Sequence, residues 1–225
     1  MTRFARWTAL AACAALLAAG CGGGSDDRDR GGTAIDWGRC EASGDTPAPG
    51  DEWQCGTLRV PLDWSEPDGG TIGLALIRAK ATGDERLGSL LFNFGGPGGS
   101  GVSMMPSYAT TASKLRERYD LVSWDPRGVA ASEGIRCRDD EEIQAAESVD
   151  STPDTPAEKR AYFADAADFG EGCRESAGKL LAHVSTTDTA RDMDRIRQAL
   201  GDDRLHYFGI SYGTELGGVY AHLFP

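Results

Sequence analysis

The stretch YFGISYGTELGG, residues 207–218, contains the pentad Gly-Ile-Ser-Tyr-Gly and decides the fold. It continues an apolar run typical of a buried strand, and a helical pattern follows it directly. A sharp turn between a strand and a helix forces its central residue into strained backbone angles and exposes that side chain at the sheet edge. Glycines two positions before and after are needed because larger side chains there would collide with the strand and the helix. The pattern therefore predicts Ser211 as a catalytic nucleophile, with Gly209 and Gly213 as the glycines of its turn.

Two kinds of strand pattern precede this turn. Residues 55–64 and 71–80 alternate apolar and polar side chains, which predicts an antiparallel hairpin. Residues 88–96, 119–128 and 203–211 each contain a continuous apolar run instead. Such runs are typical of parallel strands that are buried on both faces.

Helical patterns lie between the apolar runs. Residues 185–201 have a polar start and apolar positions on one face, and Gly201 stands where a helix commonly ends. Residues 156–182 are also predicted to be helical, whereas 138–158 are acidic, contain proline and are predicted to form a surface excursion. Strands that alternate with helices predict an α/β fold with right-handed crossovers.

The glycine-rich stretch NFGGPGGSG, residues 93–101, follows one of the apolar runs. So many glycines cost conformational entropy and therefore need a reason. One reason is a sharp turn that presents backbone N–H groups to a developing oxyanion, with the N–H of Tyr212 as a second donor. A plain glycine-rich turn is the alternative. A phosphate-binding loop does not fit, because neither GxxxxGK[ST] nor GxGxxG is present.

The segment WDPRG, residues 124–128, ends the next apolar run. We expect Asp125 and Arg127 to form a buried ion pair that holds the loops near the nucleophile. Asp125 is not predicted to be the acid of a catalytic triad, because in hydrolases with this type of turn the acid follows the serine in chain order.

Four segments together carry a family resemblance: NFGGPGGSG, SWDPRGVAASEGIRC, STTDTARDMDRIRQALG and HYFGISYGTELGGVYAHLFP. From about Trp53 to Pro225 the chain resembles the N-terminal part of secreted α/β-hydrolases, the serine peptidases of the prolyl aminopeptidase and tripeptidyl aminopeptidase family. The resemblance implies a serine exopeptidase that removes short units from peptides with a free N-terminus through an acyl-enzyme, without cofactor or metal. It also implies that Gly96 and Tyr212 donate the N–H groups to the oxyanion.

The chain departs from the family at two places. Family members often have Gly-x-Gly after the Arg-Gly pair, whereas here Ala130 lies in a place that favours glycine. The second departure concerns the base, since His183 and His206 precede Ser211 in the chain. His222 follows Ser211 on the same predicted helix, but a rise of ~1.5 Å per residue puts it roughly 16 Å away.

In the family, the strands after this helix carry the catalytic acid and base, and an inserted cap shapes the substrate pocket. We therefore interpret residues 51–225 as an incomplete α/β-hydrolase domain that ends after the nucleophile and its helix, so that the cap and the C-terminal strands are missing. The chain alone is expected to have little or no turnover. It is also expected to be poorly soluble, because the sheet would have an open apolar edge.

Residues 1–20 have the features of an export signal. Arg3 and Arg6 precede an apolar stretch that is too short to span a membrane comfortably. Small residues before Cys21 and a polar, glycine-rich stretch after it resemble a bacterial lipoprotein signal, in which the cysteine is lipidated. We thus predict a lipid anchor at Cys21 on the extracytoplasmic face of a bacterial membrane, and a flexible tether over 21–50. An ordinary secretory signal that is cleaved nearby, giving a secreted protein, is the alternative.

Cysteine usage agrees with export. Cys40, Cys55, Cys137 and Cys173 remain outside the signal, and an even number in an oxidising compartment predicts two disulfides. Three connectivities exist, of which we favour the local pairs Cys40–Cys55 and Cys137–Cys173. A zinc site is a weak alternative, because no CxxC pair is present and no histidine is near in sequence.

Composition excludes one class of partner. The formal net charge of −12, without a stripe of Lys and Arg, argues against nucleic acid. Two other functions stay open beside the peptidase: an esterase on the same fold, because fold does not fix substrate, and a non-catalytic surface lipoprotein. A haloalkane dehalogenase or an epoxide hydrolase would need Asp at position 211 and is therefore not expected.

Overall fold

The computed structural model describes residues 34–42 and 47–225. The predicted signal over 1–20 and the predicted lipidation site Cys21 lie outside the described residues. Within the described ranges, none of the helices has the length and apolar character needed to cross a membrane.

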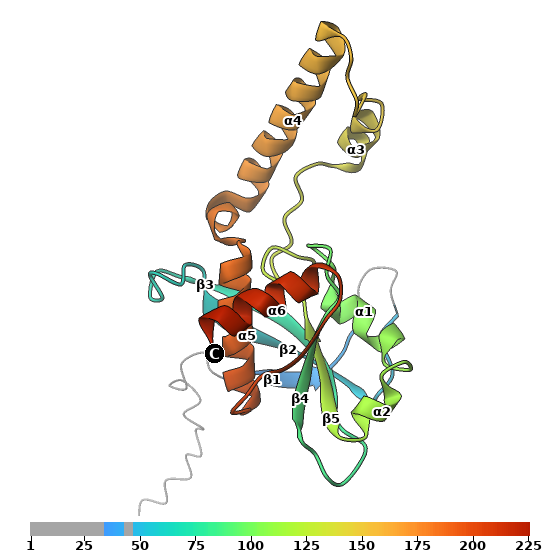
Figure 1. Ribbon diagram of the computed structural model, residues 1–225, viewed down its shortest axis with the longest axis vertical. Helices are drawn as coiled ribbons and strands as arrows, with labels where there is room; N and C mark the ends of the chain where they lie inside the picture. Colours follow the sequence, from blue (N-terminus) through green and yellow to red (C-terminus); the bar gives the residue numbers. More distant parts are fainter. Residues whose placement is uncertain (1–33, 43–46) are drawn as a thin grey trace, which may run out of the picture. The chain divides into compact units, whose positions relative to one another are not determined.

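The strands and helices follow one another along the chain with the labels of Figure 1. In order they are β1 (Asp36–Arg39), β2 (Trp53–Pro61), β3 (Thr71–Ala79), β4 (Gly88–Asn93), α1 (Gly101–Tyr108), α2 (Ser113–Arg116), β5 (Tyr119–Trp124), α3 (Asp140–Ala146), α4 (Pro156–Ala177), η1 (a 3₁₀-helix, Gly178–His183), α5 (Thr186–Leu200), β6 (His206–Gly209) and α6 (Tyr212–Leu223).

The strands form one mixed sheet in the order β1-β2-β3-β5-β4-β6. β2 and β3 pair antiparallel from Trp53 opposite Ala79 to Pro61 opposite Thr71, which confirms the predicted hairpin. β4 pairs in parallel with β5 and with β6, and chain segments that contain helices connect these strands. The predicted α/β-hydrolase architecture is therefore present as far as α6.

Burial agrees with the apolar runs for two of the three parallel strands. Every residue of β4 is buried, and so is all of β5 after its first residue. β6 differs, because it is the edge strand of the described sheet and its Phe208 is 39% exposed. The prediction that all three runs are buried on both faces is thus wrong for β6, which pairs with β4 alone among the described residues.

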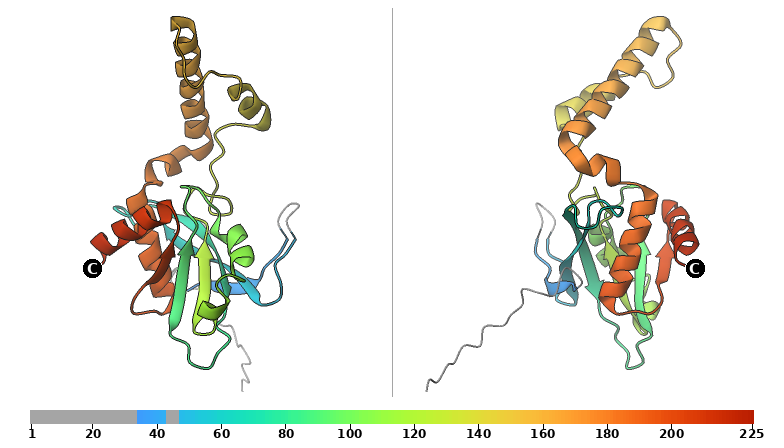
Figure 2. Two further views of the ribbon diagram at one scale, coloured as in Figure 1. Left: turned by 45° about the vertical axis from the view of Figure 1, so that its right-hand side comes forward. Right: turned by 90° about the vertical axis from the view of Figure 1, so that its left-hand side faces the viewer.

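Helices cover both faces of the sheet (Figures 1 and 2). One core cluster joins β2, β3 and β5 to Met193 and Ile196 of α5 and Leu216 of α6. The other joins the opposite face, including Phe92 of β4, to Met105 of α1. Both layers therefore support the carboxyl edge of β4 and β6, from which the glycine-rich stretch and the serine turn emerge.

The helix predicted over 185–201 is confirmed as α5 with both of its ends. Ser185 is the N-cap, and its side chain accepts a hydrogen bond from the Asp188 N–H. Gly201 ends the helix in the left-handed conformation, with φ of 77°.

Residues 135–184 leave the sheet after β5 and return to it before α5, and we refer to them as the helical excursion. They include α3, α4 and η1, and the ribbon views show α4 projecting away from the sheet (Figures 1 and 2). Every residue of α3 and α4 is exposed or half-buried. A disulfide, Cys137–Cys173, joins the outgoing leg to α4 as predicted.

Ordered structure begins earlier than the sequence predicted. β1 lies within residues 21–50, which were predicted to be a flexible tether, and pairs antiparallel with β2. The second predicted disulfide, Cys40–Cys55, joins the residue after β1 to β2. This bond and the strand pairing fix a segment whose composition alone indicates a linker.

Candidate active site

The turn around Ser211 has the geometry of a nucleophile elbow. Ser211 has φ of 54° and ψ of −122°, a conformation that residues other than glycine rarely adopt, and it is exposed. Two short bonds close the turn, from the Gly213 N–H to the Ile210 carbonyl (2.8 Å) and from the Thr214 N–H to the Ser211 carbonyl (2.9 Å). A Cβ on Gly209 would overlap the Gly213 carbonyl. The turn thus requires glycine at the positions that the pentad indicated.

The glycine-rich stretch lies directly against this elbow. Asn93 accepts the Ile210 N–H at its backbone carbonyl (3.0 Å) and the Gly95 N–H at its side-chain oxygen (3.0 Å). Gly95 has φ of 84°, and a Cβ there would overlap the Ile210 carbonyl and lie 3.1 Å from the Tyr212 nitrogen. Gly95 is therefore the glycine in closest approach to the elbow. The role of Gly96 and Tyr212 as N–H donors to an oxyanion stays a prediction.

Asp125 holds the far end of the glycine-rich stretch. Its carboxylate accepts hydrogen bonds from the Ser100 hydroxyl (2.7 Å), the Val102 N–H (3.0 Å) and the Ala131 N–H (3.1 Å). Ser100 is the N-cap of α1, so Asp125 ties that helix start to the loop that follows β5. The predicted ion pair between Asp125 and Arg127 is wrong, because the partners of the Asp125 carboxylate are these uncharged donors.

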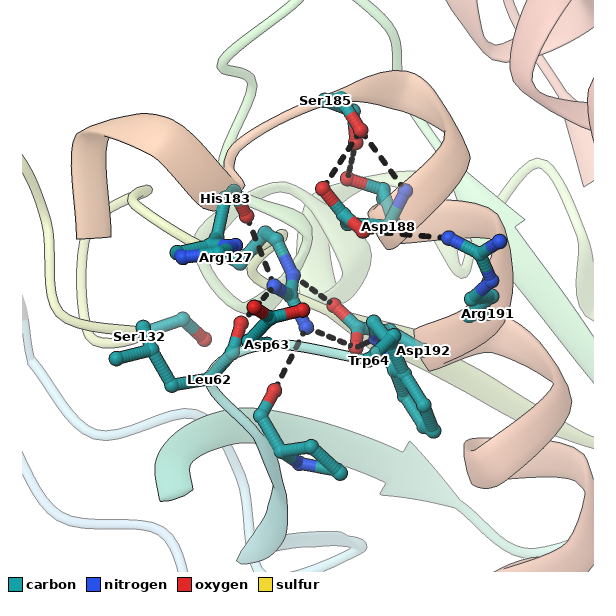
Figure 3. A network of polar contacts seen from close by, with 12 residues as sticks. Leu62, Asp63, Trp64, Arg127, Ser132, His183, Ser185, Asp188, Arg191 and Asp192 are labelled. Carbon is teal, nitrogen blue, oxygen red and sulfur yellow. Dashed lines mark hydrogen bonds and ion pairs between the residues drawn. The ribbon is translucent and has the colours of Figure 1, made fainter. Parts of the chain in front are cut away.

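Arg127 pairs with Asp192 of α5 instead (Figure 3). Two guanidinium nitrogens donate to the two carboxylate oxygens, at 2.7 and 2.6 Å, and both side chains are 0% exposed. Burial raises the pKa of Asp192 to about 6, and the hydrogen bonds from Arg127 oppose that rise. Arg127 is thus buried as predicted, but its partner lies 65 positions further along the chain.

The Arg127 guanidinium also donates to backbone carbonyls of two other chain segments (Figure 3). Its N–H groups bond to the carbonyl of Pro61, the last residue of β2, to that of Leu62, and to that of His183, which precedes the α5 N-cap. Thr186, the first residue of α5, shares a hydrogen bond of 2.7 Å with the Tyr212 hydroxyl. The network therefore connects the end of β2, the return leg of the helical excursion and Tyr212, the residue after Ser211.

The loop that contains Arg127 carries two strained residues. Ala130 has φ of 42° and Glu133 has φ of 56°. The expectation that Ala130 lies in a place that favours glycine is therefore confirmed.

His206 lies at the wrong end of the sheet to act as a base for Ser211. It begins β6, packs edge-on against Tyr119 with ring centroids 5.2 Å apart, and lies beside Gly88 at the start of β4. These are the amino ends of the parallel strands, whereas Ser211 follows the carboxyl end of β6.

The other two histidines are not bonded to Ser211 either. His183 accepts from Arg127 at its carbonyl, and His222 lies near the end of α6, roughly 16 Å along the helix from the serine. Over residues 34–42 and 47–225, no hydrogen bond joins the Ser211 hydroxyl to a histidine.

Three residues with contacts around the elbow were not predicted from the sequence: Asn93, Thr186 and Asp192. One signal was readable for Asp192, because it lies on the apolar face of its helix beside Met193 and Ile196. A carboxylate on such a face needs a buried partner.

A strained, exposed serine between a strand and a helix, with a glycine loop against it, is the arrangement found at the nucleophile turn of α/β-hydrolases. Residues 88–225 match the family described as alpha/beta hydrolase fold, and the chain belongs to that family.

Three proteins that are similar in sequence to this chain are hydrolases by name. The chain is 45% identical over 197 residues to Tripeptidyl aminopeptidase of Streptomyces coelicolor, which covers 85% of this chain and 36% of that protein. It is 41% identical over 231 aligned positions to Serine protease Hip1 of Mycobacterium tuberculosis, covering 97% of this chain and 43% of that protein. Carboxylesterase B of the same species is 41% identical over 150 residues, 65% of this chain and 29% of that protein. The predicted resemblance to peptidases of this fold is confirmed, and the chain spans less than half the length of each relative.

Proposed function

We propose that residues 34–225 form the nucleophile-bearing part of a serine exopeptidase that removes short units from peptides with a free N-terminus. The observation that carries the proposal is the strained Ser211 with the glycine loop against it. Support for peptide substrates comes from the 45% identity to a protein named Tripeptidyl aminopeptidase. No cofactor is required by this chemistry.

In the proposed reaction, the Ser211 hydroxyl attacks the carbonyl carbon of the scissile amide while its proton passes to a base. The negative charge that develops on the carbonyl oxygen accepts hydrogen bonds from the Gly96 and Tyr212 N–H groups. The C–N bond then breaks, and the amine leaves with a proton from the protonated base. Water hydrolyses the resulting ester, which releases the peptide carboxylic acid and restores the Ser211 hydroxyl.

The base and the acid that orients it are proposed to come from residues other than 34–225. Three observations on the described residues support this: no hydrogen bond joins the Ser211 hydroxyl to His183, His206 lies at the amino ends of the parallel strands, and His222 is too far along α6. A serine hydroxyl without a base is a poor nucleophile. We therefore expect the 225-residue chain alone to have little or no turnover.

The test compares the 225-residue chain with the proposed longer protein that also carries the acid and the base, referred to as the complete protein, on a chromogenic Ala-Ala-Pro amide. Turnover by the complete protein, its loss in Ser211→Ala, and none by the 225-residue chain would support the proposal. Equal turnover by both chains would contradict the origin of the base. If the complete protein did not hydrolyse the amide, the proposed peptidase activity would be contradicted.

An esterase is the second candidate, because the chain is also 41% identical over 150 residues to Carboxylesterase B. Ester and amide hydrolysis share the nucleophile and the acyl-enzyme, so the elbow alone does not separate them. Hydrolysis of p-nitrophenyl esters by the complete protein, without hydrolysis of the peptide amide, would favour this candidate.

We also propose that the protein is exported and anchored by a lipid at Cys21. The two disulfides support an extracytoplasmic location, because such bonds persist in oxidising compartments. Metabolic labelling with a radioactive fatty acid is expected to mark the wild type but not Cys21→Ala. Equal labelling of both would contradict the anchor, and release of unlabelled protein into the medium would favour secretion.

A further inference from the structure

Three glycines spaced four residues apart, Gly209, Gly213 and Gly217, surround the side chain of Tyr207. A Cβ on Gly209 or on Gly217 would lie 2.8 Å from the same ring carbon of Tyr207, and one on Gly213 would lie 3.3 Å from its hydroxyl oxygen. The ring thus occupies space that ordinary side chains at these positions would fill. The glycines of the pentad serve the tyrosine as well as the strained turn.

The Tyr207 hydroxyl donates a hydrogen bond of 2.8 Å to the Gly213 carbonyl. Burial, with a smaller contribution from Tyr212, raises the pKa of Tyr207 well above its ordinary value, so the hydroxyl keeps its proton and remains a donor. Tyr207 lies in β6 opposite Leu91 of β4, whereas Gly213 lies in the first turn of α6. This bond therefore joins the strand before Ser211 to the helix after it.

The strained conformation of Ser211 persists only if its surroundings hold it. The short backbone bonds of the turn span three residues each and do not fix the angle between β6 and α6. Tyr207 spans both elements, and its ring and hydroxyl set how closely they approach. That approach determines where the Ser211 hydroxyl and the Tyr212 N–H point.

We infer that Tyr207 is a positioning residue for the nucleophile and acts through the Gly213 carbonyl. The inference rests on the proposed function of Ser211, and one of its two readouts does not require turnover. A small displacement of reacting groups lowers the rate of the chemical step without changing how tightly substrate binds.

Tyr207→Phe in the complete protein tests the hydroxyl, and Tyr220→Phe is its matched control. Tyr220 lies on α6 too, and its hydroxyl donates to Asp194 at 3.1 Å, two turns beyond the elbow. We expect Tyr207→Phe to lower the acylation rate constant about tenfold, with KM little changed, and Tyr220→Phe to leave both near wild type. Active-site titration supplies the concentration of competent serine, so a loss of folded protein is not counted as a slower step.

A second pair of variants tests the ring. Gly217→Ala places a methyl against Tyr207, whereas a Cβ on Gly218 meets nothing within 4 Å. Both changes improve helix propensity equally. Only Gly217→Ala is expected to slow acylation.

The readout that needs no turnover is amide hydrogen exchange. The Gly213 and Thr214 amides, which close the turn, are expected to exchange about tenfold faster in Tyr207→Phe than in Tyr220→Phe. The inference would be overturned if Tyr207→Phe and Tyr220→Phe had the same acylation rate constant and the same amide exchange rates. It would also be overturned if a lower concentration of titratable serine accounted for the whole loss of rate. Faster exchange in Tyr207→Phe, in a protein whose wild type does not hydrolyse the peptide amide, would leave the positioning role in place and contradict the proposed function instead.

Discussion

The elbow and the helical excursion are both rich in hydrogen bonds, but the bonded residues differ in how far apart they lie in the sequence. Around the elbow they connect distant segments, as from Asp125 to Ser100, 25 positions away, and from Arg127 to Asp192, 65 positions away. In the excursion they are mostly local, as in the capping box of α4 between Thr155 and Glu158. The comparison indicates that the excursion can change with little effect on Ser211, whereas the elbow depends on residues across the whole sheet.

The largest expected effect comes from removing the proposed nucleophile. Ser211→Ala in the complete protein is expected to lower kcat by about a millionfold, as loss of a catalytic serine does in other hydrolases. The free energy of unfolding should not fall, because the exposed hydroxyl makes no bond among those described. Initial rates on the tripeptide amide and a urea titration measure both quantities. Wild-type turnover would remove Ser211 from the reaction.

The next expected effect is a difference in unfolding free energy between a variant near the elbow and a variant in the helical excursion. Arg127→Met leaves Asp192 buried without its cation and is expected to cost about 3–5 kcal/mol of unfolding free energy. Arg174→Met is the matched control in the excursion, where Arg174 pairs with Glu171 and is 60% exposed. That change is expected to cost no more than about 1 kcal/mol. Similar losses of unfolding free energy in urea titrations of the two variants would contradict the view that the elbow depends on distant residues and the excursion does not.

Loss of the excursion disulfide should act on the excursion alone. Cys137→Ser with Cys173→Ser is expected to destabilise this segment by about 2–4 kcal/mol, because the bond closes a long loop. Limited proteolysis should then cut within 135–184 while the sheet stays intact. The pair Cys40→Ser and Cys55→Ser is the control and should leave the excursion resistant. Cleavage spread evenly over the chain would show that the regions are coupled.

The smallest effect is a dependence on pH near Asp192. Its folded pKa, about 6, exceeds the ordinary 3.8, so the folded state holds this proton more tightly than the unfolded state does. The stability contribution of Asp192 is therefore full below pH ~4 and is lost as pH rises through ~6. The difference in unfolding free energy between wild type and Asp192→Asn should fall across that window and stay constant above it. If the difference in unfolding free energy between wild type and Asp192→Asn were constant from pH 4 to 7, the raised pKa of Asp192 would be contradicted.

Much of the sheet could be predicted from the sequence, because buried positions in β2, β3, β4 and β5 are occupied by apolar residues in alternating or continuous patterns. β1 could not be predicted, because its four residues are too few to show a periodic pattern of apolar side chains and lie among glycines, prolines and acidic residues. Its position depends on pairing with β2 and on the disulfide between Cys40 and Cys55, and the same two cysteines were a readable signal. The exposure of β6 depends on its place in the strand order, which no local pattern records.

The site divides in the same way. Ser211 and its two glycines were predictable because one strained residue dictates the types of its neighbours. The partner of Arg127 was not, because proximity in sequence favoured Asp125, whereas the fold brings Asp192 to it from α5. Tyr207 and Thr186 act through single hydroxyl groups, and no spacing rule identifies such contacts in advance.

The glycines of α6 also bear on the kinetics of folding. Gly213 and Gly217, which lie against Tyr207, and Gly218, which does not, fall within the 12 residues of α6, and each weakens a helix by about 1 kcal/mol relative to alanine. A helix this short and this rich in glycine does not form alone in water. We expect α6 to become ordered only after β6 has joined the sheet and Tyr207 is in place, so the elbow is assembled late. Substitutions in α6 should then speed unfolding and leave the refolding rate almost unchanged, which stopped-flow measurements on Leu216→Ala can check.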